Sequence, residues 1–304
     1  MGGGHWSDDA FRTVSSARAH TAPKDVFRAT TMHDDINPGK MKMEMRESRD
    51  SADHPYSHAI IVGFDVTGSM GKIPHFFAKE ALGVLMQHLL DKKPVPDPQL
   101  LVAAVGDATC DRYPLQVGQF ESDNRVDQWL TKIVLEGGGG GQDRESYGLV
   151  HHFAGMHTSI DCFEKRGQRG FLFTVGDEKP CEHMAAAEMG RVFGYPEPQD
   201  VALTRAIRSA ERLYDVIHVI VKSHSYTPAQ NIDDWRRHLG QNVLVLEDYL
   251  ALAELIIATI GLRAGMTADA AMKGFGAAST ALVSTSGVLS LQPRATTGGD
   301  IAVL

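Results

Sequence analysis

The sequence predicts an α/β fold: a doubly wound, mostly parallel six-stranded sheet with helices on both faces and extensions at both ends. Two observations predict it. From His58 onward, apolar runs rich in β-branched residues alternate with segments whose apolar residues recur at helical spacing. The chain has 304 residues and is 43% hydrophobic, which is enough for one large core. We expect this domain at 58–264, after an N-terminal extension at 1–57 and before a tail of small residues at 265–304.

The first 57 residues are polar and interrupted by prolines. They are expected to lie over the surface of the main domain, or to form an arm that binds a partner. Within them Met41, Met43 and Met45 alternate with charged residues, as on an edge strand, so a short strand or helix is expected at 40–49. The tail at 265–304 is rich in Ala, Gly, Ser and Thr. It is expected to be weakly ordered or to dock on the domain, with a helix at 267–282.

Strands and helices of the main domain follow from the two hydrophobic periods. The expected strands are 60–64, 99–106, 115–120, 170–176, 215–222 and 242–246. The third of these is short and is expected at or near an edge of the sheet. The expected helices are 73–90, 123–133, 145–157, 200–213, 228–239 and 250–262.

The first strand leads into the most informative motif of the chain, Asp65-Val-Thr67-Gly-Ser69. These polar residues come just past the C-terminal end of a buried strand, where open α/β sheets place their ligand crevices. One carboxylate and two hydroxyls offer only hard oxygen ligands, which suit Mg²⁺, with Mn²⁺ or Ca²⁺ as alternatives. The competing interpretation is that Asp65 caps the following helix and that the hydroxyls belong to an ordinary turn.

This motif, with its upstream strand and downstream helix, resembles the first part of the metal-ion-dependent adhesion site (MIDAS) of von Willebrand factor type A (vWA) domains. The resemblance covers roughly residues 58–262. It implies a doubly wound, Rossmann-like sheet with one short antiparallel edge strand, and a divalent cation at the C-terminal edge of the sheet. It leaves both ends of the chain unexplained.

The resemblance also implies a Thr from a second loop and an Asp from a third loop. The glycine-rich second loop lacks that Thr, and Asp143 or Glu145 is the candidate replacement. The alternative is a flexible turn without a ligand role. In the third loop Asp177 is the expected ligand, bound directly or through water, and Glu178 is a weaker candidate. The metal site predicted in full is Asp65, Thr67, Ser69, Asp143, Glu145 and Asp177.

The function implied by the resemblance is non-enzymatic. A cation at this site would present an open coordination position to an acidic side chain of a partner protein. The resemblance, to the bacterial intracellular type of this domain, also implies an adaptor or assembly subunit of a larger complex, so homo- or hetero-oligomers are expected.

Two alternatives from other classes remain. One is a Mg²⁺-dependent phosphohydrolase with Asp65 as the nucleophile, although such enzymes need a second Asp where Thr67 stands. The other is a scaffold subunit that needs no metal.

Composition excludes several classes. The formal net charge of -8 argues against a nucleic-acid or anionic-membrane surface. No apolar run has membrane-spanning length and the N-terminus lacks the pattern of a secretory signal, so the cytoplasm is the expected location. The three cysteines, widely spaced, predict neither disulfides nor a zinc site.

Overall fold

The computed structural model describes residues 4–18, 21–41, 44–70, 72–136, 144–222 and 229–292. Its centre is a six-stranded sheet in the order β12-β11-β7-β2-β3-β4, in which every neighbouring pair is parallel except β3 and β4. This confirms the predicted fold class and its short antiparallel edge strand. The strands are β2 (His58–Asp65), β3 (Pro98–Val105), β4 (Leu115–Val117), β7 (Gly170–Gly176), β11 (Tyr214–Val221) and β12 (Val243–Leu246).

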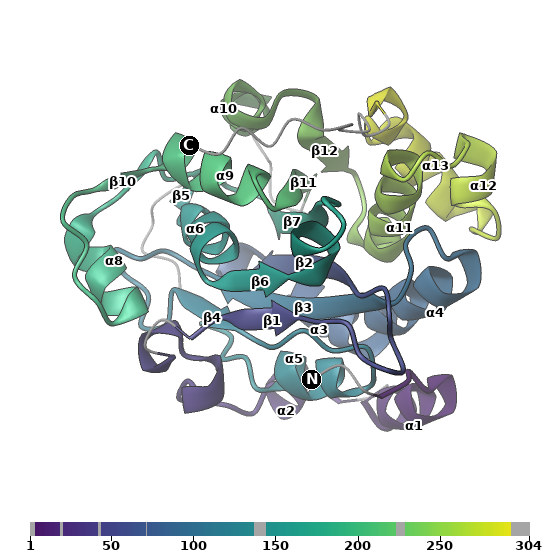
Figure 1. Ribbon diagram of the computed structural model, residues 1–304, viewed down its shortest axis with the longest axis horizontal. Helices are drawn as coiled ribbons and strands as arrows, with labels where there is room; N and C mark the ends of the chain where they lie inside the picture. The colour runs from purple at the N-terminus through teal and green to yellow at the C-terminus, as the bar shows by residue number, and fades with distance from the viewer. Residues whose placement is uncertain are drawn as a thin grey trace.

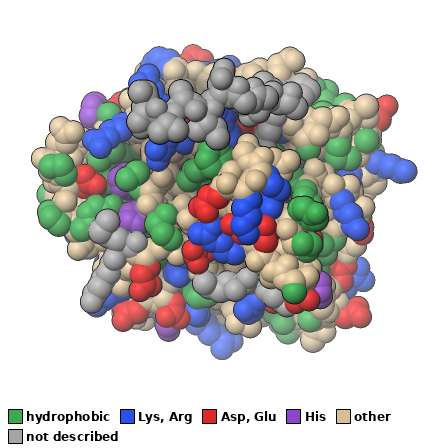
Figure 2. All heavy atoms as spheres, viewed as in Figure 1, with side chains coloured by type: hydrophobic (Ala, Val, Ile, Leu, Met, Phe, Trp, Pro, Cys, Tyr) green, Lys and Arg blue, Asp and Glu red, His purple; other side chains and the backbone are tan. Residues whose placement is uncertain are grey.

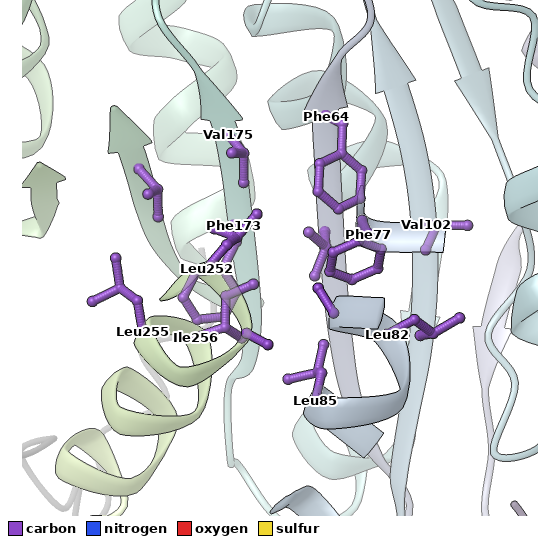
Figure 3. Packing of buried hydrophobic residues seen from close by; sticks show 14 of the residues in the cluster. Phe64, Phe77, Leu82, Leu85, Val102, Phe173, Val175, Leu252, Leu255 and Ile256 are labelled. Carbon is purple, nitrogen blue, oxygen red and sulfur yellow. The ribbon is translucent and has the colours of Figure 1, made fainter. Parts of the chain in front are cut away.

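Two buried cores lie on the two faces of the sheet, because successive side chains of a strand point to opposite sides. Along β2, Val62 and Phe64 belong to one core and Ile61 to the other. On the first face the Phe64 and Phe77 rings meet with centroids 4.5 Å apart (Figure 3). The helical segments of this face are α3 (Ile73–Phe76), a π-turn (Phe77–Ala81), α4 (Leu82–Lys92), α5 (Arg125–Thr131) and α11 (Leu252–Arg263).

The second face is covered by helices from the later part of the chain. Among them α6 and α9 pack against each other across this face (Figure 1). These helices are α6 (Gly148–Met156), α8 (Ala186–Phe193), α9 (Leu203–Glu211) and α10 (Ala229–Leu239).

The chain reverses its direction across the sheet at β2. From β2 it proceeds to β3 and β4 on one side, and then returns to β7, β11 and β12 on the other. The pair β2 and β7 is therefore the topological switch point, and the crevice beyond the C-terminal ends of such strands is where open α/β sheets bind ligands. Asp65 ends β2 and Asp177 follows β7, so both predicted acidic residues flank this position.

The N-terminal extension lies against the main domain, one of the two expected arrangements. Phe11 is buried in the first core, and Arg18 donates two hydrogen bonds of 2.5 and 2.9 Å to the Asp127 carboxylate. The strand expected at 40–49 is present as three residues, which pair in parallel with β6. These elements are α1 (Asp8–Arg18), α2 (Pro23–Val26), β1 (Arg46–Ser48) and β6 (Thr158–Ile160).

The C-terminal segment docks on α11, and the single helix predicted at 267–282 is wrong. Two short helices, α12 (Ala268–Met272) and α13 (Ala277–Thr285), stand in its place. Gly274 has φ +85° between them, a conformation that ends a helix. Val283 and Val288 contribute to the first core, so part of this segment is packed into the domain.

The helix predicted at 145–157 begins later than expected, because α6 starts at Gly148. The preceding residues form a two-residue strand that pairs in parallel with residues 179–180 beyond β7. Periodicity does not reveal pairs this short. The elements not predicted include α1, α2, β6 and α8, whose bounds are given above. They also include β5 (Arg144–Glu145), α7 (Asp161–Glu164), β8 (Lys179–Pro180), β9 (His183–Met184) and β10 (Val201–Ala202).

The exterior carries charges of both signs. On the face in Figure 2, acidic and basic side chains are intermixed, with hydrophobic side chains between them. Within the described residues, no helix is long and apolar enough to cross a membrane.

Candidate functional site

Asp65 is the centre of the site and is 0% exposed. Its Oδ1 accepts hydrogen bonds from the backbone N–H of Thr67 at 2.8 Å and from the Thr67 hydroxyl at 2.6 Å. The turn is held to the sheet because Val66 donates its N–H to the carbonyl of Val105 on β3. Ser69 lies in the 3₁₀ turn η3 (Gly68–Met70), and its side chain falls outside the described residues.

Tyr147 engages the other oxygen of Asp65. It precedes α6, and its Oη donates to Asp65 Oδ2 at 3.1 Å. Gly176 at the end of β7 makes room for this phenol, since a Cβ there would lie 1.8 Å from the Tyr147 hydroxyl oxygen. Both oxygens of Asp65 are thus fixed in direction, one by its own turn and one by the second loop. Sequence reasoning missed Tyr147, which reads as one more apolar residue of a helix.

Glu145, one of the two candidates for the second-loop metal ligand, lies close to Asp65. Its side chain is 4% exposed, and its Oε2 has no hydrogen-bond partner. Burial raises the pKa of Glu145 well above its usual range, and the nearby charges of Asp65, Asp111 and Asp107 raise it further. A buried carboxylate with an unsatisfied oxygen among other carboxylates favours uptake of a positive charge. Asp143, the other candidate, lies outside the described residues.

Asp177 is buried directly after β7, across the switch point from Asp65. Its backbone is anchored from α10, because Asn231 donates to the Asp177 carbonyl at 3.1 Å and Trp235 donates to the Glu178 carbonyl at 3.1 Å. Burial raises the pKa of Asp65, and the charge of Asp177 adds to that rise, whereas the hydrogen bonds from Thr67 oppose it. The structure therefore brings Asp65, Glu145 and Asp177 to one edge of the sheet.

A second acidic turn, not predicted, lies at the end of the neighbouring strand β3. Asp107 Oδ1 accepts from the N–H of Thr109 at 2.8 Å and its Oδ2 accepts from the Thr109 hydroxyl at 2.7 Å, whereas in the Asp65 turn one oxygen accepts both bonds. Asp111 in turn accepts from the N–H of Asp107 at 2.7 Å. The signal was present in the sequence, because Asp107-Ala-Thr109 after an apolar strand repeats Asp65-Val-Thr67.

The donor set around Asp65 consists of carboxylates and a hydroxyl, the oxygen ligands that Mg²⁺ and Ca²⁺ take. The unsatisfied Oε2 of Glu145 fits a cation at this edge. Across the described part of the chain, however, no three His, Cys, Asp or Glu side chains are grouped closely enough to hold a metal ion on their own. Hydroxyl groups or water would therefore have to complete the coordination.

Histidines cluster behind this edge. The ring of His218 stacks on Trp235 with centroids 3.6 Å apart, and His218 Nδ1 lies 2.8 Å from the Thr174 hydroxyl. Both ring nitrogens of His151, on α6, are buried without a hydrogen-bond partner. Burial lowers the pKa of His151 to about 3, so this ring is neutral in the folded protein. These side chains form the packed support of Tyr147, whose ring contacts both His218 and Trp235.

No protein-family model and no curated protein matches this sequence. Among solved structures, the open conformation of the pilus adhesin SpaC from Lactobacillus rhamnosus GG is 6% identical with a TM-score of 0.44, covering 80% of this chain and 31% of the adhesin. A von Willebrand factor type A protein from Catenulispora acidiphila is 15% identical with a TM-score of 0.39, over 68% and 42%. The protein BatB from Bacteroides thetaiotaomicron is 9% identical with a TM-score of 0.38, over 66% and 95%. These are likenesses of fold.

Proposed function

We propose that this chain is a non-enzymatic protein-interaction module whose binding surface is completed by a divalent cation, with Mg²⁺ the favoured ion. The observation that carries the proposal is the fully buried Asp65 at the switch point, beside a second buried carboxylate, Glu145, whose Oε2 is unsatisfied. Asp65 and the Thr67 hydroxyl would hold the ion, and Asp177 and Glu145 would reach it directly or through water, because no three acidic side chains of the described residues are grouped closely enough to hold it on their own. The role of Ser69 in this set is inferred from the motif alone. A bound cation would neutralise charges that otherwise repel one another.

The proposed role is that of an adaptor or assembly subunit in a larger cytoplasmic complex. A hydrolase with Asp65 as the nucleophile is less well supported, because such an enzyme needs a second acidic residue two positions later. Thr67 occupies the position where the second Asp of such an enzyme would stand.

Calorimetric titration with Mg²⁺ and Mn²⁺ tests the proposal. Wild-type protein should bind the ion saturably, and Asp65→Ala should abolish this binding. Thr67→Val, which removes only a hydroxyl, should weaken it. Asp91→Ala is the matched control, because it removes an exposed carboxylate far from the predicted site. Asp91 lies at the end of α4, just before the start of β3, whose C-terminal end is the one near the site.

Circular dichroism would establish that each variant is folded. Unchanged binding by folded Asp65→Ala would refute the site. Equal retention of interacting proteins with and without chelator would instead favour the metal-independent scaffold.

A further inference from the structure

The C-terminal edge of the sheet gathers more carboxyl groups than one divalent cation can neutralise. Four of its carboxylates are buried and form no ion pair with any described Lys or Arg side chain within 4 Å; they are Asp65, Asp107, Asp111 and Glu145. Arg191 approaches this region, but it donates to the backbone carbonyls of Ala108 and Asp111 rather than to a carboxylate. Arg144 is exposed at the rim.

Glu145 is held in this position by its neighbours. The N–H of Ser146 donates to the Gly106 carbonyl at 3.2 Å, and the Ser146 hydroxyl accepts from the N–H of Ala108 at 2.9 Å. The carbonyl of Glu145 itself accepts from the N–H of Cys181 at 2.9 Å. The second loop is therefore fastened both to the turn after β3 and to the segment after β7. These bonds fix the backbone of Glu145, and its carboxyl group is buried with Oε2 unsatisfied.

The balance of charge decides what kind of partner this edge fits. One divalent cation neutralises two carboxylates. If Asp65, Asp177 and Glu145 surround the ion, three negative charges remain at this edge, one from these ligands and one each from Asp107 and Asp111. The charge of Arg191 lies near Asp111 and favours its ionised form. An acidic side chain approaching the ion would add a further negative charge close to these three, whereas a basic side chain would be attracted by them.

We propose that Glu145 supplies from within the chain a carboxylate to the cation, and that the edge around it receives a basic, Lys- or Arg-containing segment of a partner protein. This inference rests on the proposed function and names the chemistry of the partner. It departs from the acidic partner group that the family resemblance implies. The basic side chain would lie over Glu145 and the Asp107 turn, and would not bind the ion itself.

Binding of two labelled peptides tests this inference. Both would be eight residues long and identical in sequence, except that one carries three lysines where the other carries three aspartates. Fluorescence anisotropy would be measured with Mg²⁺ at about 0.15 M salt, where screening suppresses attraction over more than about 8 Å. The full chain should bind the lysine peptide at least about tenfold more tightly than the aspartate peptide.

Two variants separate this edge from the overall negative charge. Glu145→Thr replaces the carboxyl group with a hydroxyl and should reduce the preference for lysine by about tenfold. Glu211→Gln also removes one carboxylate, but at the N-terminal edge of the sheet, where α9 ends before β11 begins. It should leave the preference for lysine unchanged. Equal effects of the two variants, or a preference of the wild type for the aspartate peptide, would overturn the inference.

Calorimetry with Mg²⁺ on the same samples distinguishes the two proposals. Cation binding that depends on Asp65, together with a preference for the aspartate peptide, overturns the basic partner and leaves the proposed function standing. A preference for the lysine peptide that depends on Glu145, without any cation binding, overturns the proposed function and supports a basic partner segment.

Discussion

Replacement of Glu145 by Gln should stabilise the protein in the absence of divalent cations. The substitution keeps the shape of the side chain and removes a carboxyl group that is buried at 4% exposure with Oε2 unsatisfied. Burial raises the pKa of Glu145 to about 10, so the group stays protonated at pH 7 in the folded protein without a cation, and this protonation costs free energy that a Gln side chain does not. This expectation is opposite to that for most substitutions of buried residues.

The size of the effect follows from the raised pKa of Glu145. Glu145 loses its proton at lower pH in the unfolded chain than in the folded protein. The free energy of unfolding therefore falls as the pH rises above 4.5, the pKa of a glutamate in the unfolded chain. Each pH unit costs at most about 1.4 kcal/mol, so the ceiling at pH 7 is about 3 kcal/mol. We expect a gain of about 1–3 kcal/mol for Glu145→Gln at pH 7, shrinking towards zero near pH 4.5.

Urea unfolding followed by tryptophan fluorescence, at pH 5, 6, 7 and 8 with EDTA, measures this gain. Comparison of the variant with wild type at each pH cancels the contributions of all other titrating groups. Saturating Mg²⁺ should reduce the advantage of the variant, because the ion compensates Glu145 in the wild type. A variant that is less stable than wild type at every pH, or a gain that does not change with pH, would refute the reasoning.

Three further changes probe the support of the site. Tyr147→Phe removes the donor to Asp65 Oδ2 and should weaken Mg²⁺ binding about fivefold in calorimetry while costing about 1 kcal/mol in urea unfolding; unchanged affinity would contradict the positioning role. Arg18→Ala leaves Asp127 without its cation and should cost about 2–3 kcal/mol and expose α1 to proteolysis; resistance equal to wild type would count against this anchor. His151→Leu should gain stability relative to wild type as pH falls from about 6.5 towards 3, because the unfolded histidine takes up a proton that the buried ring does not; a difference independent of pH would argue against a buried neutral ring.

The sheet was predictable because its strands are long, apolar and separated by clear helical periods. The turn at Asp65 was predictable for a related reason, since its residues follow directly from the end of a strand. The side chain of Ser69 and the whole of Asp143 lie outside the described residues, so their roles remain predictions. The division of the chain at 57 and 264 likewise remains a prediction.

Other parts of the site depend on contacts that sequence spacing does not encode. Glu145 was identified as a candidate, but in a helix rather than in a short strand, because its pairing with Pro180 joins residues far apart in the chain. The bond from Tyr147 to Asp65 spans 82 positions and depends on the space left by Gly176. Asp107 was within reach of sequence reasoning, since its turn repeats the motif that identified Asp65.

A crystal structure from crystals grown with Mn²⁺ tests the central claim most directly. We predict an anomalous peak beyond the C-terminal end of β2, about 2.0–2.6 Å from a carboxylate oxygen of Asp65 or Asp177 and from the Thr67 hydroxyl. Crystals of Asp65→Ala grown in the same way should lack the peak. Well-ordered wild-type crystals at saturating Mn²⁺ with no peak at this position, or with a peak only elsewhere on the molecule, would contradict the claim that this edge is a cation site.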